Sequence, residues 1–255
     1  MWKTISASVA GSAHSRRAVE CQDKSEVLVY DVQGSCHLVA AVADGAGSAL
    51  HGALGAQIVV TEMVRTLIQC ADAVTPPSEV DARQWISNLQ GILDERAAEI
   101  SEEIGALACT LLACLIGPMH SVFIHIGDGG WIAKVDNELQ AVTYPYSGEY
   151  ENETVFITTP TCVDKLQFVC IERPVEMVAA YTDGLQHLCL DYRSRRPHEG
   201  FFGPIMLRLS ETKNVDALNE SLVAFLNSDA INERTDDDKT LFMAVRDEAY
   251  QNTCF

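Results

Sequence analysis

Apolar runs of strand length that border an aspartate are the feature that most restricts how this chain can fold. Aspartate is unfavourable inside a strand, and burying it as an anion without a partner is costly. Repeated placement of aspartate at the ends of buried strands therefore predicts that carboxylates gather around a cation. The four runs and their acids are 39–43 with Asp44, 122–126 with Asp128, 178–182 with Asp183, and 240–245 with Asp236-Asp237-Asp238.

A tight turn is the alternative explanation for an Asp-Gly pair. Asp128-Gly129 fits a turn, because strand-like sequence lies on both sides of it. Asp44 and Asp183 fit poorly, because each follows a strand-like run and precedes a helical segment. Mg²⁺ and Mn²⁺ prefer oxygen ligands, and two such ions can act together on a phosphoryl group. Spacing alone leaves the turn and the metal site open.

The bulk composition excludes several classes of protein. The 255 residues carry a net charge of −18, which argues against binding to nucleic acid or to an anionic membrane. No stretch approaches about 20 consecutive apolar residues, and the N-terminus lacks a secretory signal, so we expect a soluble, cytoplasmic protein. The 9 cysteines include no C-x-x-C pair and predict reduced core thiols.

The order of the predicted elements favours an α+β fold with antiparallel sheets, because strands come in groups and helices come as an early pair and singly later. We expect strands at 3–9, 26–32, 37–43, 107–116, 121–126, 131–135, 139–143, 175–182 and 240–245. Helices are expected at 49–71, 82–104, 185–190 and 215–226, with an irregular stretch at 144–173 and a basic loop at 193–203.

Six short motifs, in order along the chain, resemble those of the metal-dependent serine/threonine phosphatases of the protein phosphatase 2C type (the PPM family), most closely its compact bacterial members. Each motif is weak alone, but six in the right order form a specific pattern. The motifs are Gln22-Asp23, Ala43-Asp44-Gly45-Ala46-Gly47-Ser48, Cys109-Thr110, Gly127-Asp128-Gly129, Thr182-Asp183-Gly184 and Asp237-Asp238-Lys239-Thr240.

The resemblance implies one catalytic domain over residues 1–255, with a variable flap around 144–173. It implies a four-layer αββα sandwich, in which two antiparallel β-sheets are flanked by helices. It also implies two Mn²⁺ or Mg²⁺ ions at one end of the sandwich and a weaker third ion.

The resemblance also implies the ligands. Asp44 would bridge the two ions and the Gly45 carbonyl would bind one of them. Asp183 and Asp237 would ligate the other ion, and catalysis would depend on these two residues and on Asp44. The remaining two acids are Asp23, acting through bound water, and Asp128, at the third ion.

Departures from the family pattern concern the phosphate and the leaving group. Ala46 stands where many members have a histidine that is thought to protonate the leaving alkoxide. The expected phosphate-binding arginine has only offset candidates, Arg17 and Arg16, with His14 nearby. Gln22 replaces the usual acid of the first motif.

The implied activity is hydrolysis of phosphoserine and phosphothreonine in proteins by a metal-bridging hydroxide. The implied partners are phosphoprotein substrates of a serine/threonine kinase, with no nucleic acid and no membrane, and we expect a monomer. The alternative is a phosphatase-fold regulatory or phosphopeptide-binding protein with weak or no turnover. The C-x₅-R spacing from Cys189 to Arg195 does not predict a cysteine nucleophile, because the segment lacks glycine and follows a helical stretch.

Overall fold

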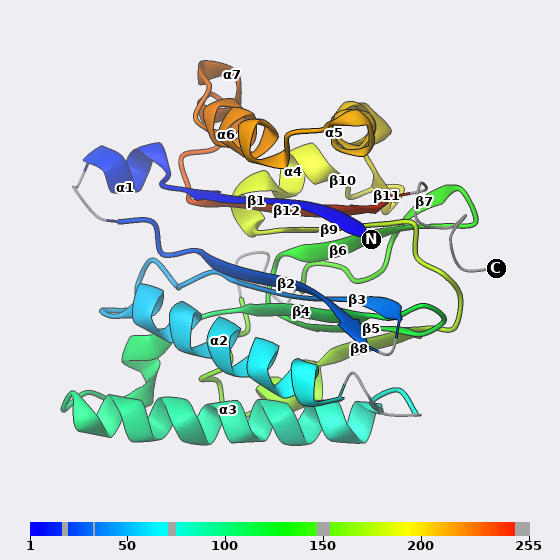
Figure 1. The fold of residues 1–255 in the computed structure, drawn as a ribbon. Helices are drawn as coiled ribbons and strands as arrows, with labels where there is room; N and C mark the ends of the chain where they lie inside the picture. The colour runs from blue at the N-terminus through cyan, green and yellow to red at the C-terminus, as the bar shows by residue number, and fades with distance from the viewer. Residues whose placement is uncertain (17–19, 33, 71–74, 147–153, 248–255) are drawn as a thin grey trace.

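Two antiparallel five-stranded sheets pack face to face in the computed structural model, which describes residues 1–16, 20–32, 34–70, 75–146 and 154–247 (Figure 1). One sheet has the strand order β1-β12-β9-β6-β7 and the other has the order β2-β3-β4-β5-β8. Helices α5 and α6 cover the first sheet, and α2 and α3 cover the second (Figure 1). The predicted αββα sandwich is confirmed.

The elements of each layer are as follows. The first sheet contains β1 (Trp2–Val9), β6 (Gly130–Val135), β7 (Glu138–Ala141), β9 (Met177–Tyr181) and β12 (Lys239–Arg246). The second contains β2 (Lys24–Val32), β3 (Ser35–Ala43), β4 (Leu111–Ile116), β5 (Ser121–Ile126) and β8 (Gln167–Ile171). The covering helices are α2 (Gly52–Cys70), α3 (Glu79–Glu99), α5 (Glu199–Glu211) and α6 (Val215–Leu226). Shorter elements are α1 (Ser12–Arg16), α4 (Gln186–Cys189), β10 (Leu190–Asp191), β11 (Arg196–Pro197) and α7 (Asp229–Asn232).

Burial on both faces explains why the central strands are continuously apolar. Successive side chains of a strand point to opposite faces of its sheet. In β3, Val39 and Ala41 pack toward the helices, whereas Leu38 and Ala40 pack between the sheets. Both faces are therefore mostly apolar, and a carboxylate is tolerated more easily where a strand ends. This is the reason that the aspartates border the runs.

The two largest differences from the predicted helices are the end of α3 and the start of α5. Helix α3 ends at Glu99, five residues earlier than expected, and Ser101 has a positive φ of 61° that cannot continue a helix. Helix α5 begins at Glu199, inside the basic segment predicted to be a loop, and its glycines and Pro204 also disfavour a helix. Burial of Phe202 and Leu209 against the first sheet outweighs this poor helix propensity.

The segment predicted to be irregular is also shorter than expected. Residues 147–153 lie outside the described residues, but Gln167–Ile171 forms β8 and pairs with β5 as an edge strand. Its half-buried side chains give weak hydrophobic periodicity, so the sequence carried little strand signal. In the described part of the chain, no helix is long and apolar enough to span a membrane.

Candidate metal centre

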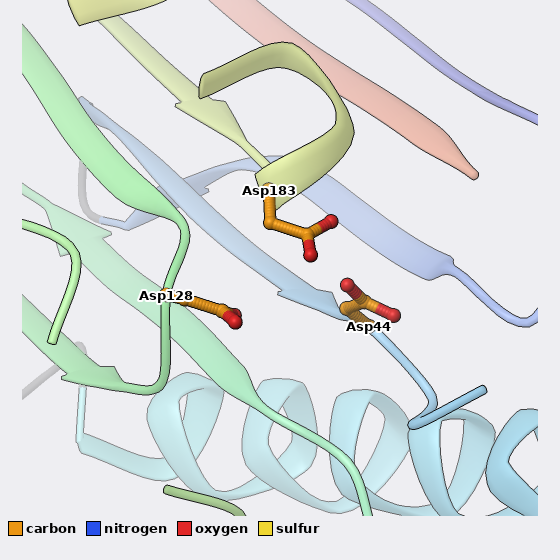
Figure 2. A group of neighbouring side chains, drawn as sticks. All are labelled: Asp44, Asp128 and Asp183. Atoms are coloured by element: carbon orange, nitrogen blue, oxygen red, sulfur yellow. The ribbon is translucent and has the colours of Figure 1, made fainter. Parts of the chain in front are cut away.

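Three carboxylates from both sheets meet at one end of the sandwich (Figure 2). Asp44 follows β3 of the second sheet, and Asp183 follows β9 of the first. Asp128 lies in the turn that crosses from β5 to β6, and therefore from one sheet to the other. One carboxylate oxygen of each residue lies within 4.8 Å of those of the other two. The strand ends thus bring together acids that are far apart in the sequence.

The position of Asp128 corrects the simple turn interpretation. A hairpin would pair β5 with β6, but β5 pairs with β4 and β8, and β6 pairs with β7 and β9. Gly127 has a φ of +120°, in the region that favours glycine, and this lets the chain change sheets. The turn directs the Asp128 carboxylate toward those of Asp44 and Asp183 (Figure 2).

Contacts with Cys109 and Thr110 fix the loop that carries Asp44. Its N–H donates to Thr110 Oγ1 at 3.0 Å, and its carbonyl accepts from the Thr110 N–H at 2.9 Å. The next residue, Gly45, forms an isolated β-bridge with Cys109. These contacts give the Cys109-Thr110 motif a structural role, because it holds the loop at the strand end.

A fourth acid, Asp23, lies behind the cluster and is only 1% exposed. Its Oδ2 accepts hydrogen bonds from Thr182 Oγ1 at 2.8 Å and from Thr240 Oγ1 at 2.7 Å. Its Oδ1 is buried without a hydrogen-bond partner, and so is Oδ1 of Asp183. Thr182 and Thr240 both belong to the motifs, but their contacts with Asp23 join segments that are far apart in the sequence, so no local pattern predicts this role.

The electrostatics of the cluster indicate that a cation belongs there. Burial, followed by the charges of Asp23, Asp183, Asp128 and Asp237, raises the pKa of Asp44 well above its usual value. Burial and the neighbouring carboxylates also raise the pKa of Asp183 to about 8. For Asp23, burial is the main cause, and its pKa rises to about 6 despite the hydrogen bonds from the threonines.

The unpartnered oxygens and the mutual repulsion fit a hard divalent cation, which prefers oxygen ligands and would offset the carboxylate charges. The donor set consists of carboxylate oxygens, which Mg²⁺ and Mn²⁺ prefer. A buried carboxylate oxygen without a partner is otherwise unfavourable.

Adjacent residues Asp237 and Asp238 have different environments. Asp237 is exposed and is not part of the three-carboxylate group, but its charge raises the pKa values of Asp128 and Asp183. Asp238 is buried and accepts hydrogen bonds from the N–H groups of Gly11 at 2.7 Å and Gln22 at 2.6 Å. Asp238 is therefore satisfied by the protein, whereas the charge of Asp237 acts on the acidic centre.

The candidate phosphate ligands are only partly described. Arg17 lies outside the described residues, and Arg16 ends α1 with a side chain that is also outside them. His14, in the same helix, has its Nδ1 atom 2.9 Å from Asp238 Oδ1. Ala46 is 6% exposed and carries no polar group, and the Gln22 side-chain oxygen is buried without a partner.

Cys189 does not have the environment of a nucleophile. It is fully buried at the end of α4, and burial raises the pKa of its thiol well above the usual value. A thiolate nucleophile requires the opposite shift and an exposed sulfur atom.

Comparisons with known proteins agree with this geometry. Residues 10–227 match the protein phosphatase 2C family. The chain belongs to this family. It is 34% identical to serine/threonine-protein phosphatase 3 of Escherichia coli (strain K12), over 96% of this chain and 98% of that protein.

Similar folds occur among solved structures of low sequence identity. The serine/threonine phosphatase Stp1 from Staphylococcus aureus is 15% identical, with a TM-score of 0.63 over 97% of this chain and 96% of that one. RsbX, solved in complex with magnesium, is 14% identical, with a TM-score of 0.56 over 96% of this chain and 94% of that one. These two likenesses support the fold.

Proposed function

We propose that this protein phosphatase 2C family member hydrolyses phosphoserine and phosphothreonine in proteins, in a metal-dependent reaction. The observation that carries the proposal is the convergence of Asp44, Asp128 and Asp183 from two sheets, with a buried oxygen of Asp183 left without a partner. The full-length similarity to a serine/threonine phosphatase supports the same activity.

The residues proposed to hold two Mn²⁺ or Mg²⁺ ions are those that the family resemblance implied. Asp44 and the Gly45 carbonyl would bind at the centre, together with Asp183 and Asp237. Asp23 would act through water, and Asp128 would serve a weaker third ion. When bound, such ions neutralise phosphate charge and make water nucleophilic at neutral pH.

The protein itself contributes orientation and charge. The Thr182 and Thr240 hydroxyls fix one oxygen of Asp23, which leaves its other oxygen directed away from hydrogen-bond donors. The backbone contacts of Thr110 fix Asp44. Such preorganisation matters because small displacements of a metal ligand cost large factors in rate. We assign phosphate binding to the Arg16 and Arg17 region beside His14.

The proposed partners are phosphoproteins modified by a serine/threonine kinase, and we propose a cytoplasmic monomer. The net charge of −18 is unfavourable for nucleic acid and for anionic membranes. The alternative function, phosphopeptide binding with weak or no turnover, was motivated by Ala46 and Gln22. The retained carboxylate cluster favours catalysis over this alternative, because binding alone does not need it.

The deciding experiment is an assay of the purified chain with phosphoseryl and phosphothreonyl peptides and p-nitrophenyl phosphate in millimolar Mn²⁺. We expect phosphate release that stops on chelation by EDTA and is lost in Asp44→Asn and Asp183→Asn. The matched control is Asp94→Asn, on the exposed face of α3, which should retain full activity. Tight phosphopeptide binding by calorimetry, without phosphate release, would instead support the binding function.

A further inference from the structure

His14 lies between a buried carboxylate and the loop that follows Asp44. Its Nδ1 atom is 2.9 Å from Asp238 Oδ1, at ion-pair distance, although the two are not aligned as a hydrogen bond. On the other side of the ring, a Cβ atom added to Gly47 would come within 3.8 Å of His14 Nε2. One ring nitrogen therefore faces a carboxylate, and the other faces the backbone beside the acidic centre.

The surroundings of Asp238 make this arrangement rigid. The Asp238 side chain is 3% exposed and also accepts hydrogen bonds from the N–H groups of Gly11 and Gln22. The N–H of Ala13 donates to the Asp236 carbonyl at 2.9 Å, which ties α1 to the segment before β12. Helix α1 is thus attached to the 236–238 segment both through the backbone of Ala13 and through the side chain of His14.

The free side of the ring can be reached by other molecules. The His14 side chain is 13% exposed, whereas its Nδ1 atom beside Asp238 is buried, so the exposed part of the side chain excludes Nδ1. The charge of Asp238 acts on Asp23, so His14 and its partner lie close to the carboxylate cluster.

The proposed reaction needs a proton donor. A serine or threonine alkoxide is a poor leaving group, and protonating it as the phosphorus–oxygen bond breaks accelerates the reaction by about 10²–10⁴-fold. Ala46 has no proton to give, and the cluster carboxylates are committed to cations. His125 is fully buried, and burial lowers its pKa to about 3, so it cannot serve.

We infer that His14, positioned by Asp238, is the residue that protonates the leaving serine or threonine oxygen. This inference rests on the proposed phosphatase function. It replaces a phosphate-binding role for His14, and it leaves phosphate binding to the Arg16 and Arg17 region. Asp238 is a positioning residue, in the sense that a carboxylate orients the imidazole of a catalytic pair.

The proton and electron balance is that of ester hydrolysis. The oxygen of the attacking water forms a bond to phosphorus, and the bond from phosphorus to the seryl oxygen breaks. The electron pair of the broken bond goes to the seryl oxygen, which takes the proton from His14 Nε2. The water releases one proton to solvent, and the exposed side of the ring regains one from there.

The test compares leaving groups that do and do not need a proton. p-Nitrophenolate can leave without being protonated at neutral pH, whereas a seryl oxygen needs a proton in order to leave. We expect His14→Gln to lower kcat for a phosphoseryl peptide by about 10²-fold or more. The same variant should change kcat for p-nitrophenyl phosphate by less than about threefold. Imidazole added to His14→Ala should restore part of the peptide activity, while thermal melting and Mn²⁺ binding stay close to wild type.

The matched control is His120→Gln, in the exposed turn between β4 and β5 at the other end of β3 from Asp44. It should leave both activities unchanged. An equal loss on both substrates, with weaker inhibition by inorganic phosphate, would show a phosphate ligand and overturn the inference. Two other histidines are His51, directly before α2, and His187, in α4. A selective loss of peptide activity in His51→Gln or His187→Gln, and not in His14→Gln, would also overturn the inference.

A measurement on the unaltered enzyme covers the case in which the His14 variants do not fold. Across a series of aryl phosphates, proton donation makes kcat depend weakly on the acidity of the leaving phenol. A steep dependence in the wild type would overturn the inference. Absence of hydrolysis of any substrate by the wild type would instead be a failure of the proposed function.

Discussion

The aspartates of the acidic centre and the buried Asp238 have opposite environments, although Asp238 directly follows Asp237, whose charge acts on that centre. In the acidic centre, Asp44 and Asp183 repel each other and their neighbours, and a buried oxygen of Asp183 has no partner. At Asp238, backbone N–H groups at 2.6 and 2.7 Å and a histidine surround the carboxylate. The acidic centre is unfavourable without a cation, whereas the carboxylate of Asp238 is satisfied by groups of the protein.

The contrast teaches that burial of an acid does not by itself mark a metal ligand. What separates the two groups is whether protein donors satisfy the oxygens. By this criterion Asp238 supports structure and orients His14, and Asp44 and Asp183 serve the cation.

The largest effect is expected from neutralising Asp44. Asp44→Asn should lower kcat/KM for a phosphopeptide by about 10³-fold or more, roughly 4 kcal/mol of transition-state stabilisation, because a metal ligand is lost. The melting temperature of the metal-free protein should not fall, because the change removes a repelled charge. Kinetics and thermal melts in EDTA measure the two effects.

A loss of metal-free stability comparable with that of a core substitution would contradict this view of Asp44. It would mean that the carboxylate is satisfied by the protein, as Asp238 is. The exposed Asp94→Asn on α3 provides the baseline for both measurements.

Asp238→Ala should show the opposite behaviour. It leaves the N–H groups of Gly11 and Gln22 buried without an acceptor, which should lower the free energy of unfolding by roughly 2–5 kcal/mol. The loss should be the same with and without Mn²⁺, because the residue does not hold the ion. Urea unfolding in both conditions tests this, and a loss seen only with Mn²⁺ would assign Asp238 to the metal centre.

The role of the acids that lie in a distinctive local pattern could be predicted from the sequence, but contacts between distant segments could not. Asp44 and Asp183 were identifiable because the order strand, Asp-Gly, helix lies within a short segment and excludes a hairpin. Asp128 followed the same pattern between two strands, and only the sheet topology shows that those strands belong to different sheets. Turn chemistry is local, whereas strand pairing is not.

The residues that contact these acids could not be predicted either, because they come from distant parts of the sequence. Thr182 and Thr240 reach Asp23 from distant strands, and His14 meets Asp238 across nearly the whole chain. No periodicity or spacing joins such pairs in a single sequence. The start of helix α5 was missed because it lies in a basic segment that predicts a loop, and its glycines and proline also disfavour a helix. Burial against the first sheet outweighs both.

The acidic centre should also make the metal-free protein sensitive to pH. The folded-state pKa values of Asp23, about 6, and Asp183, about 8, are raised above those of an unfolded chain. The native state therefore holds more protons, and stability falls as pH rises through this range. Thermal melts in EDTA between about pH 5 and pH 9 should show this fall.

Saturating Mg²⁺ should reduce the fall of stability with rising pH. Asp183→Asn should reduce the same fall in the absence of metal. The exposed Asp94→Asn on α3 provides the comparison and should leave the slope with pH unchanged. A slope in EDTA that is the same in wild type and in Asp183→Asn would show that groups outside the acidic centre cause it.

The smallest effect is expected at Asp128, which is intermediate between the two groups. Its Oδ2 accepts a hydrogen bond from Thr154 Oγ1, so one oxygen is satisfied by the protein while the carboxylate still faces Asp44 and Asp183. Asp128→Asn can keep the bond to Thr154 and removes one charge. We expect kcat to fall by about tenfold, with the affinity for the first Mn²⁺ nearly unchanged by calorimetry. A loss as large as that of Asp44→Asn, with weaker binding of the first ion, would place Asp128 among the primary ligands, because a carboxylate that only supports the centre cannot have that effect.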